Sequence, residues 1–545
     1  MAEINKKREF ATPDFAGVNT QALRLAIKPN EQSWLENIQP IGPGNARTVP
    51  NISTAILQLP TRGASQPQVY YAQGFNVIIN GSPADILMVA DTLGDIWAIN
   101  VNTNSLTYIS RGGAYQGQFA NASFAQWKNE RIMIIDSNYG LFDWYPGGVS
   151  GVLTYSGAGG SGYTGTNRPS AGQCIATFSG RVWVSNNRTV FYSAPGSYND
   201  WTTNSAAGSF VITDETLHSS VQQMVASSNF LYIFGVDSCN VISNVVVSGT
   251  STLFTNTNLS TGVGTPFPMS TTTYGRSIWF ASVTGFYAMY GASARKESTP
   301  LDGMFGNIQN LYSPAAVGAV PTISAGLVSI NNILCIAFLF QYNDSLFTTQ
   351  TVQRPLMALY FDGKWFFASQ GATSGQTAPT IIADALVGGK NNLYAFDSSG
   401  IMYQLFSTRS TSVTWRFQTA LWDFDQQIMY KQLTKAGLGA YFNGASTGIT
   451  LYTDNESQSG IFAAGGTQTY SLLTSSGLTF TGAGGVPISF VGTGPITWAS
   501  GGYNLMQTDV TNWGRYIGFT LQGNTTDMTL TMIAAEYNYR SQWGS

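Results

Sequence analysis

A pair of short apolar strands joined by a tight turn recurs along this chain and constrains the fold more than any other feature. Examples are ADILMVADTLGDIWAIN, NERIMIIDSNYGLFDWYP and RSIWFASVTGFYAMYG. In such turns Asp or Ser bonds nearby backbone amides, and Gly or Asn takes the left-handed position. The aligned turns run from Asp91 to Gly94, Asp136 to Gly140, Asp237 to Asn240, Ser282 to Gly285 and Asp397 to Gly400.

The spacing of these turns favours a β-propeller. The turn positions 91, 136, 187, 237 and 282 lie about 45 to 51 residues apart, which is typical of blades with four strands each. The longer gap before 397 contains a further hairpin around QYND, near residue 343. We therefore predict an all-β fold with a six- or seven-bladed propeller-like domain over 61–410. A stacked array of β-sandwiches is the alternative.

The two ends of the chain differ from this repeat. Residues 1–60 carry Pro and Gly too densely for a regular domain and predict an extended arm, with a short helix at Asn19–Ile27. Residues 411–545 contain longer alternating strands and predict a β-sandwich, in which Tyr516–Leu521 reads as a half-buried strand. Within it, 455–505 is rich in Gly, Ser and Thr and predicts a long loop or an extra hairpin pair.

Composition excludes several function classes. Charged residues make up 10% of the 545 residues, against about 25% in ordinary soluble proteins, and the net charge is −3. No strong basic field is therefore expected to attract nucleic acid or anionic lipid. No apolar run approaches the roughly 18 residues of a membrane helix, and the N-terminus does not resemble a secretory signal. The three cysteines are too dispersed for a disulfide framework.

No catalytic, cofactor or metal site is predicted. His218 is the single histidine and reads as a surface or turn residue. Residues 160–165 match GxGxxG only in a Gly-rich loop, without the strand and helix of a dinucleotide site. Asp423 and Asp425 are expected on one face of a strand, as surface carboxylates rather than a glycosidase pair. The adjacent Asp214 and Glu215 would point apart. Most Trp and Tyr residues are expected in the core.

One stretch is more specific than the repeat itself. It runs from GRVWVSNNRTVFYSAPGSYNDW to LYIFGVDSCNVISNV, and IWFASVTGFYAMYGASARKES follows it. Pro195-Gly196 is expected to fix a turn and Trp201 to cap a blade at an exposed edge. Together with the ending NWGRYIGFTLQG…MTLTMIAAEYNYRSQWGS and the opening QSWLENIQPIGPG, this stretch resembles the tail hub or nozzle proteins of short-tailed bacteriophages, also called packaged-DNA stabilisation proteins.

The resemblance covers most of the chain, although only 181–300 and 511–545 are specific. The Gly-rich loop near 150–170 and the segment 455–505 depart from the family pattern. The residues that carry the resemblance are structural, not catalytic: Tyr192, Pro195, Gly196, Asp200, Trp201, Gly235, Trp279, Gly285, Phe286, Gly514, Arg515, Tyr516, Gly518 and Phe519.

The resemblance implies a virion structural protein that is made in the host cytoplasm. Members of the family form a homohexameric ring beneath the portal and its adaptor ring. That ring continues the DNA channel, helps retain packaged double-stranded DNA without sequence specificity, and supports tail fibres or spikes. No enzyme activity, cofactor or membrane insertion is implied. Inward loops such as 150–170 are candidates for a DNA gate.

Two other function classes remain open on the sequence. A non-catalytic glycan-binding or adhesion propeller would use the abundant aromatic side chains. A polysaccharide-degrading phage propeller would use carboxylates such as Asp423 and Asp425. Fold alone decides neither of them.

Overall fold

A computed structural model describes most of the chain. The described residues are 7–12, 14–42, 44–109, 117–147, 153–155, 162–213, 217, 219–259, 262–316, 318–344, 352–371, 378–442, 446–456, 468–472, 489–490, 494–495 and 502–540. His218, Asp214, Glu215 and most of 455–505 lie outside them. The described secondary structure is strands and three short 3₁₀ segments, η1 (Thr203–Ser205), η2 (Pro268–Ser270) and η3 (Thr299–Asn307). The predicted all-β class is confirmed.

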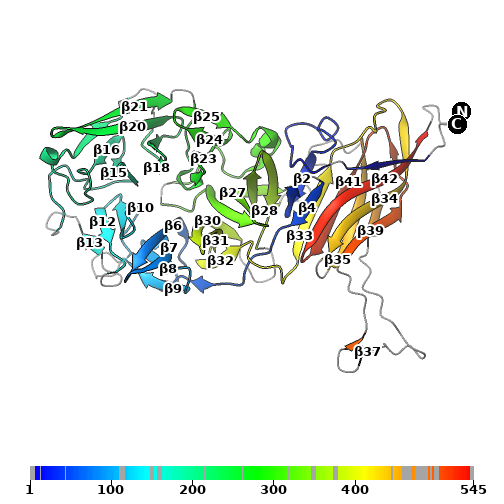
Figure 1. The fold of residues 1–545 in the computed structure, drawn as a ribbon, viewed down its shortest axis with the longest axis horizontal. Helices are drawn as coiled ribbons and strands as arrows, with labels where there is room; N and C mark the ends of the chain where they lie inside the picture. The colour runs from blue at the N-terminus through cyan, green and yellow to red at the C-terminus, as the bar shows by residue number, and fades with distance from the viewer. Residues whose placement is uncertain are drawn as a thin grey trace.

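Six small four-stranded sheets stand in a ring, and four strands of a larger sheet complete it as a seventh blade (Figure 1). In chain order, from the axis outwards, the blades are β6 (Val69–Ile79), β7 (Ser82–Asp91), β8 (Ile96–Asn100), β9 (Ser105–Tyr108); β10 (Ala122–Trp127), β11 (Arg131–Asp136), β12 (Gly140–Trp144), β13 (Leu153–Tyr155); β14 (Cys174–Phe178), β15 (Arg181–Asn186), β16 (Thr189–Tyr192), β17 (Gly208–Val211); β18 (Gln223–Ser227), β19 (Phe230–Phe234), β20 (Cys239–Ser248), β21 (Ser251–Leu259); β22 (Thr272–Tyr274), β23 (Ser277–Ser282), β24 (Gly285–Tyr290), β25 (Ser293–Lys296); β26 (Ile323–Ile330), β27 (Ile333–Asp344), β28 (Val352–Phe361), β29 (Lys364–Ala368); and β30 (Pro379–Val387), β31 (Lys390–Asp397), β32 (Ile401–Leu405), β5 (Leu57–Gln58).

The repeated hairpins of the sequence are the second and third strands of these blades. Asp136 shows why the turn recurs: its Oδ1 accepts the backbone amides of Asn138 at 2.8 Å and Tyr139 at 3.0 Å, and Gly140 follows at φ 82°. Asp91 and Asp397 likewise accept two local amides, from the residues two and four positions further on. The QYND hairpin is β27 and β28 of the sixth blade. The propeller prediction is confirmed.

The second domain is a sandwich of two sheets. One contains β3 (Ile38–Gly42), β4 (Asn45–Thr48), β42 (Met528–Arg540), β34 (Tyr430–Phe442) and β39 (Gly502–Asp509), with β1 (Arg8–Ala11) on β42 and β40 (Trp513–Gly514) on β34. The other contains β2 (Gln32–Glu36), β33 (Val413–Thr419), β41 (Ile517–Thr525), β35 (Ser446–Asn455) and β36 (Gln468–Leu472). A separate pair joins β37 (Ser489–Phe490) to β38 (Gly494–Pro495).

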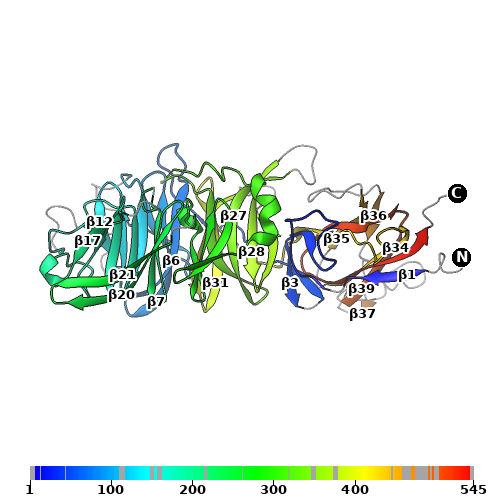
Figure 2. The same ribbon diagram turned by 90° about the horizontal axis from the view of Figure 1, so that it is seen from above.

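The two domains share a sheet. Strand β2 pairs in parallel with β29 of the sixth blade and antiparallel with β33 of the sandwich, so nine strands from β26 to β36 form one continuous sheet. One hydrophobic core runs with it, from Trp279 and Phe286 in the fifth blade to Leu521 and Ile533 in the sandwich. The domains therefore form one elongated body (Figure 2).

Residues 1–60 supply strands to both domains. β1 to β4 belong to the sandwich, whereas β5 pairs with β32 and completes the last blade of the propeller. The expected helix at Asn19–Ile27 is wrong: this segment consists of turns and bends. It lies on the outer face of the second sandwich sheet, where the Arg24 side chain is fully buried.

That cover also corrects the expectation for Tyr516–Leu521. Strand β41 lies between β33 and β35, and Ile517, Phe519 and Leu521 face the core. The opposite face is buried as well, because Gly518 and Thr520 lie beneath Arg24 and its partner Asp454. The strand is therefore buried on both faces and not half-buried.

Candidate functional site

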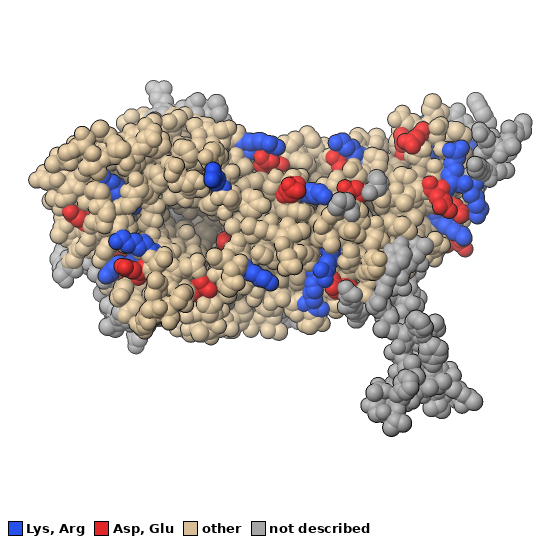
Figure 3. Space-filling view, in the orientation of Figure 1, with Lys and Arg blue, Asp and Glu red and all other residues tan. Residues whose placement is uncertain are grey.

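A large hollow lies on the axis of the propeller. It is a cavity of about 390 Å³, lined by the innermost strand of every blade: β6, β10, β14, β18, β22, β26 and β30. Figure 3 shows the propeller hollowed at its centre. Small and amide-bearing side chains dominate the wall, among them Ala72, Gln73, Ala176 and Gln223. The central channel of a propeller is a usual place for a ligand or a partner to bind.

Asp384 on β30 is the one charged side chain among the residues that line this cavity. Seclusion from water raises the pKa of its carboxyl to about 6, against which the backbone amide of Leu327 donates to the ionised form. Glycines on the two neighbouring inner strands, β6 and β26, leave room for β30 to pack closely beside them. A Cβ at Gly74 would lie 2.2 Å from the carbonyl oxygen of Asp384, and one at Gly326 would lie 2.8 Å from Leu393.

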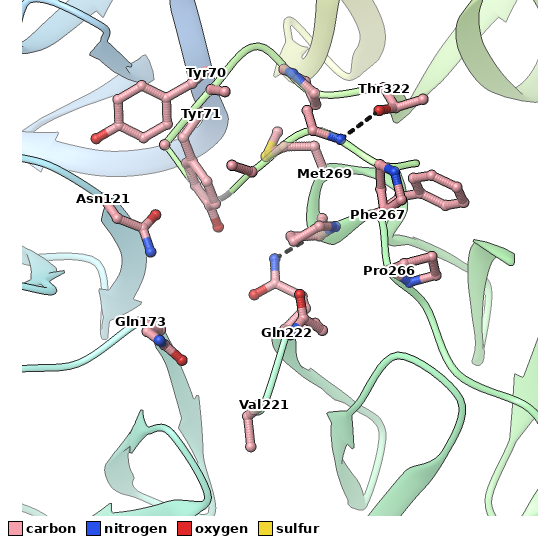
Figure 4. A pocket seen from close by; sticks show the side chains of 18 residues that line it. Tyr70, Tyr71, Asn121, Gln173, Val221, Gln222, Pro266, Phe267, Met269 and Thr322 are labelled. Carbon is pink, nitrogen blue, oxygen red and sulfur yellow. Dashed lines mark hydrogen bonds between the residues drawn. The ribbon is translucent and has the colours of Figure 1, made fainter. Parts of the chain in front are cut away.

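A smaller pocket of about 60 Å³ adjoins the axial cavity, and the two share Tyr71, Gln223, Pro268 and Met269. The side chains of Asn121, Gln173 and Gln222 approach it from three neighbouring blades (Figure 4). Gln223 Nε2 donates to the Pro268 carbonyl at 3.3 Å, and the Ala315 amide donates to Thr322 Oγ1 at 2.9 Å. These bonds hold the segments 266–269 and 314–322 against the pocket.

The amide side chains around this pocket have unused hydrogen-bonding capacity. Among the described residues, the buried Oε1 of Gln173 has no hydrogen-bond partner. The neighbouring Tyr71 hydroxyl instead bonds to Gln73 Oε1 at 3.2 Å and accepts from Ser123 Oγ at 3.3 Å. Such a surface can bind neutral polar groups, because amides supply both donors and acceptors.

A buried ionic cluster joins the propeller to the sandwich. Arg354 on β28 binds Glu36 on β2 with two bonds, Nη1–Oε1 at 2.6 Å and Nη2–Oε2 at 2.9 Å, and its Nε bonds to Asp344 at 2.6 Å. Ser369 Oγ and Trp34 Nε1 donate to the same Glu36 carboxylate. Burial acts to raise the pKa of Glu36, but the Arg354 guanidinium outweighs it and lowers this pKa to about 2.

A second buried pair fixes the N-terminal segment to the sandwich. Arg24 Nη2 lies 2.9 Å from Asp454 Oδ2, and both side chains are completely inaccessible to solvent. Arg24 Nε also donates to the Thr419 carbonyl at 3.1 Å, and Thr520 Oγ1 donates to Asp454 at 2.7 Å. Burial lowers the pKa of Arg24 and raises that of Asp454, so this pair is held at a desolvation cost.

The sequence-predicted signature residues do not converge on one site. The first group lies in the third blade, mostly in the connection between β16 and β17, and in the fourth blade. Tyr192 packs 5.1 Å from Trp183, the Pro195-Gly196 turn has Gly196 at φ 73°, and Asp200 Oδ1 accepts from the Thr202 amide at 2.9 Å. Trp201 is wholly buried, with the Gly165 backbone against it, so the expected exposed edge anchor is wrong. Gly235 lies after β19 against Leu217.

The other signature residues lie between the fifth and sixth blades and in the sandwich. Phe286 stacks on Phe338 with ring centroids 4.1 Å apart, and Trp279 lies 4.5 Å from Tyr360. Gly285 precedes Phe286 in β24, at φ 149°. In the sandwich, the amides of Arg515 and Tyr516 donate to Glu456, beside Gly514, whereas Gly518 and Phe519 belong to β41. These contacts give the signature residues structural roles, in ring packing and in backbone hydrogen bonding.

The remaining candidate residues of the sequence are also placed. Asp423 and Asp425 are not on a strand face: they lie in a turn in which the Asp425 amide donates to Asp423 Oδ1 at 3.0 Å. Part of 150–170 lies outside the described residues, but Tyr163 is buried and donates to Asp143 at 2.7 Å. Cys174, Cys239 and Cys335 are buried free thiols, and burial raises the pKa of Cys174 to about 12.

The described part of the chain contains no group of three or more His, Cys, Asp or Glu residues placed to hold a metal ion. None of its helices has the length and apolar character needed to cross a bilayer.

The sequence did not indicate the axial wall or the ionic junction. The hairpin pattern identifies turns, but the inner strands carry ordinary Ala, Gln and Thr residues that become a lining only when seven blades close. Glu36 is more than 300 positions from Asp344 and Arg354 in the sequence. A charged residue inside an otherwise apolar strand was the available signal, since charges in such strands are seldom buried without a partner.

Comparisons with known proteins identify no family for this chain. No family model matches the chain, and no curated protein matches it. Among solved structures, the extracellular domain of the putative hybrid two-component system BT4673 from B. thetaiotaomicron is similar over 67% of this chain, with 9% identity and a TM-score of 0.38. This chain spans 40% of the length of that protein. The structure of U3-55K is similar over 63% of this chain and 98% of its own, with 10% identity and a TM-score of 0.36.

Proposed function

We propose that this protein is a non-enzymatic structural component of a bacteriophage tail. In this proposal it is a nozzle or hub subunit that assembles with copies of itself beneath a portal and adaptor. Packaged double-stranded DNA then passes through the ring formed by the copies, and tail fibres or spikes attach to it. The sequence resemblance suggests this role, and the rigid connection between the two domains supports it.

The observation that carries the proposal is the continuous joint between the domains. A nine-stranded sheet, a common hydrophobic core and the Glu36–Arg354–Asp344 cluster cross the boundary together. Domains joined by a linker move relative to each other by default. This chain instead forms one stiff body, which suits a subunit that must transmit load within a particle and hold a fixed channel.

The test combines solution mass with virion composition. Six copies of a 58.6 kDa chain give about 350 kDa, and we expect a closed ring of that mass by light scattering and negative-stain imaging. We also expect the protein in purified virions by mass spectrometry, at a copy number matching one ring. Its absence from virions of a phage that encodes it would refute the proposal, whatever the purified protein does in solution.

A second candidate function is the binding of a neutral glycan without catalysis. The pocket formed by Tyr71, Asn121, Gln173 and Gln222, with its unpartnered Gln173 oxygen, favours it. Binding on a glycan array that Gln173→Ala abolishes, and that Gln426→Ala on the sandwich turn leaves unchanged, would support this function. Uniform failure to bind neutral glycans would exclude it.

A further inference from the structure

The carboxyl group of Asp384 lies in the wall of the axial cavity without a counter-ion. Asp384 belongs to β30, and its side chain is partly accessible from the cavity. The backbone amides of Leu327 and of Asp384 itself stabilise its ionised form, and no Lys or Arg of the described residues pairs with it. A carboxylate held away from water in this way is costly unless a cation compensates it.

The adjacent inner strands fix the position of this carboxyl group. A Cβ added at Gly326 on β26 would lie 3.2 Å from Asp384 Oδ1, so the glycine leaves the space that the carboxyl occupies. On the other side, a Cβ at Gly74 on β6 would lie 2.2 Å from the Asp384 carbonyl oxygen. Because both neighbours lack a side chain, the three strands pack closely and hold Asp384 at the cavity wall.

The charge on Asp384 weakens the fold and does not stabilise it. The pKa of this carboxyl is raised to about 6, so the folded state loses stability as the pH rises from about 4 to about 6. An asparagine in its place could still accept a backbone amide, because it retains one acceptor oxygen. Charged groups that lower stability in this way are concentrated at functional sites. A ligand therefore explains the charge better than folding does.

The rest of the cavity wall is uncharged and partly polar. Among the residues that line it, none is Lys, Arg or His, and Asp384 alone is charged. Gln73 on the adjacent strand β6 is exposed and lines the cavity, and Thr177 and Thr273 line it from the third and fifth blades. Amides and hydroxyls both donate and accept, so they suit the hydroxyl groups of a ligand. The cavity volume of about 390 Å³ lies in the range of small-molecule sites.

Charge and coordination number disfavour other classes of ligand in this cavity. The negative charge of Asp384 repels phosphates, carboxylates and nucleic acid. A Ca²⁺ ion takes about six or more oxygen ligands, and the described residues hold no cluster of acidic side chains that could supply them. An organic ammonium ion needs a single anionic partner, and amides and hydroxyls can bind its remaining polar groups.

We propose that the axial cavity binds a small organic amine that carries hydroxyl groups, an amino polyol or amino sugar, with its ammonium group at Asp384. The hydroxyl groups of the ligand bind Gln73 and the threonines of the wall. This inference is independent of the proposed tail function, since it needs neither a ring nor DNA. It also differs from the neutral glycan site, because the residues that line the adjoining pocket at Gln173 include no charged side chain.

Titration calorimetry of the purified full-length chain tests this proposal with two matched probes. Glucamine is sorbitol with one terminal hydroxyl replaced by an amino group, so the pair differs only in the ammonium ion. At about pH 8, where Asp384 is ionised, we expect glucamine to bind at least about tenfold more tightly than sorbitol, because charge-assisted hydrogen bonds are the stronger ones. Asp384→Asn should abolish this preference. Asp362→Asn, in the exposed turn after β28, is the matched control and should retain it.

Several results would overturn the proposal. These are a wild-type chain that binds neither probe, one that binds both equally, and an Asp384→Asn variant that keeps the preference for glucamine. Equal binding of both probes that Gln173→Ala removes would place the ligand in the adjoining pocket instead. Asp384→Asn should fold at least as stably as wild type at this pH, so a lost preference reports on the site and not on unfolding. The composition of virions decides the tail proposal separately.

Discussion

The propeller and the sandwich are both closed by the first 60 residues, but by different means. In the propeller, the two-residue strand β5 completes the last blade, and the joints between blades are apolar and aromatic. In the sandwich and at its junction, the N-terminal segment is fastened by buried charges, Arg24 to Asp454 and Glu36 to Arg354. The ring is therefore stabilised mainly by packing, whereas the position of the sandwich is specified by directional polar contacts.

The largest expected effect comes from breaking the most buried of these ion pairs. Arg24→Met leaves the Asp454 carboxylate uncompensated in the interior, and we expect a loss of about 3–5 kcal/mol in the free energy of unfolding. The double variant Arg24→Met with Asp454→Leu should recover most of that loss, since it removes both desolvated charges. Urea denaturation measures both variants. A double variant as unstable as the single one would show that the pair itself stabilises the fold.

The junction cluster gives a pH-dependent test. Because the pKa of Glu36 is about 2 in the folded chain and about 4.5 when unfolded, its ionisation stabilises the fold above about pH 4.5. That stabilisation, about 3 kcal/mol, is lost as the pH falls toward 2. Glu36→Gln should remove it at pH 7 and flatten the acid limb of a plot of melting temperature against pH. Glu9→Gln on the exposed β1 is the control and should leave that limb unchanged.

A turn carboxylate tests the propeller side of the comparison. Asp136 accepts the amides of Asn138 and Tyr139 within its turn, and its Oδ2 accepts those of Ala120 and Asn121 at 3.0 and 3.2 Å. Asp136→Ala leaves these donors unpaired, and we expect a loss of about 2 kcal/mol, measured by thermal unfolding. Asp136→Asn retains one acceptor oxygen and should lose less. Equal losses would mean that the charge, not the acceptor geometry, matters.

The smallest effect is expected at the axial cavity, and it has the opposite sign. The pKa of Asp384 is raised to about 6, so ionisation destabilises the folded state as the pH rises from about 4 to about 6. Asp384→Asn should therefore stabilise the chain at pH 8, by about 1 kcal/mol once screening by water in the cavity is allowed for, and have little effect at pH 4. Calorimetry at both pH values makes the comparison. Equal stabilisation at pH 4 would point to packing instead.

The sequence predicted the propeller because its signal is local. Asp136 and Gly140 lie in one turn, and the same pattern repeats at nearly constant spacing. The partners of β2 and the cover over β41 could not be predicted in this way, because Arg24 and Asp454 are 430 positions apart and each looks like an ordinary surface charge. The lining of the axial cavity could not be predicted for a related reason. Its Gln and Ala side chains come together only when the ring of blades closes.

The pairing of β1 with β42 has a consequence for synthesis. Residues Arg8–Ala11 find their partners at Ala534–Tyr537, so the first strand emerges from the ribosome long before the last. The blades can form in order as they are translated, because their contacts are local. Strand β1, by contrast, must wait unpaired until β42 has been made. Synthesis of β42 is then the step that lets β1 pair, and chains truncated before Met528 lack the partner strand on which that step depends.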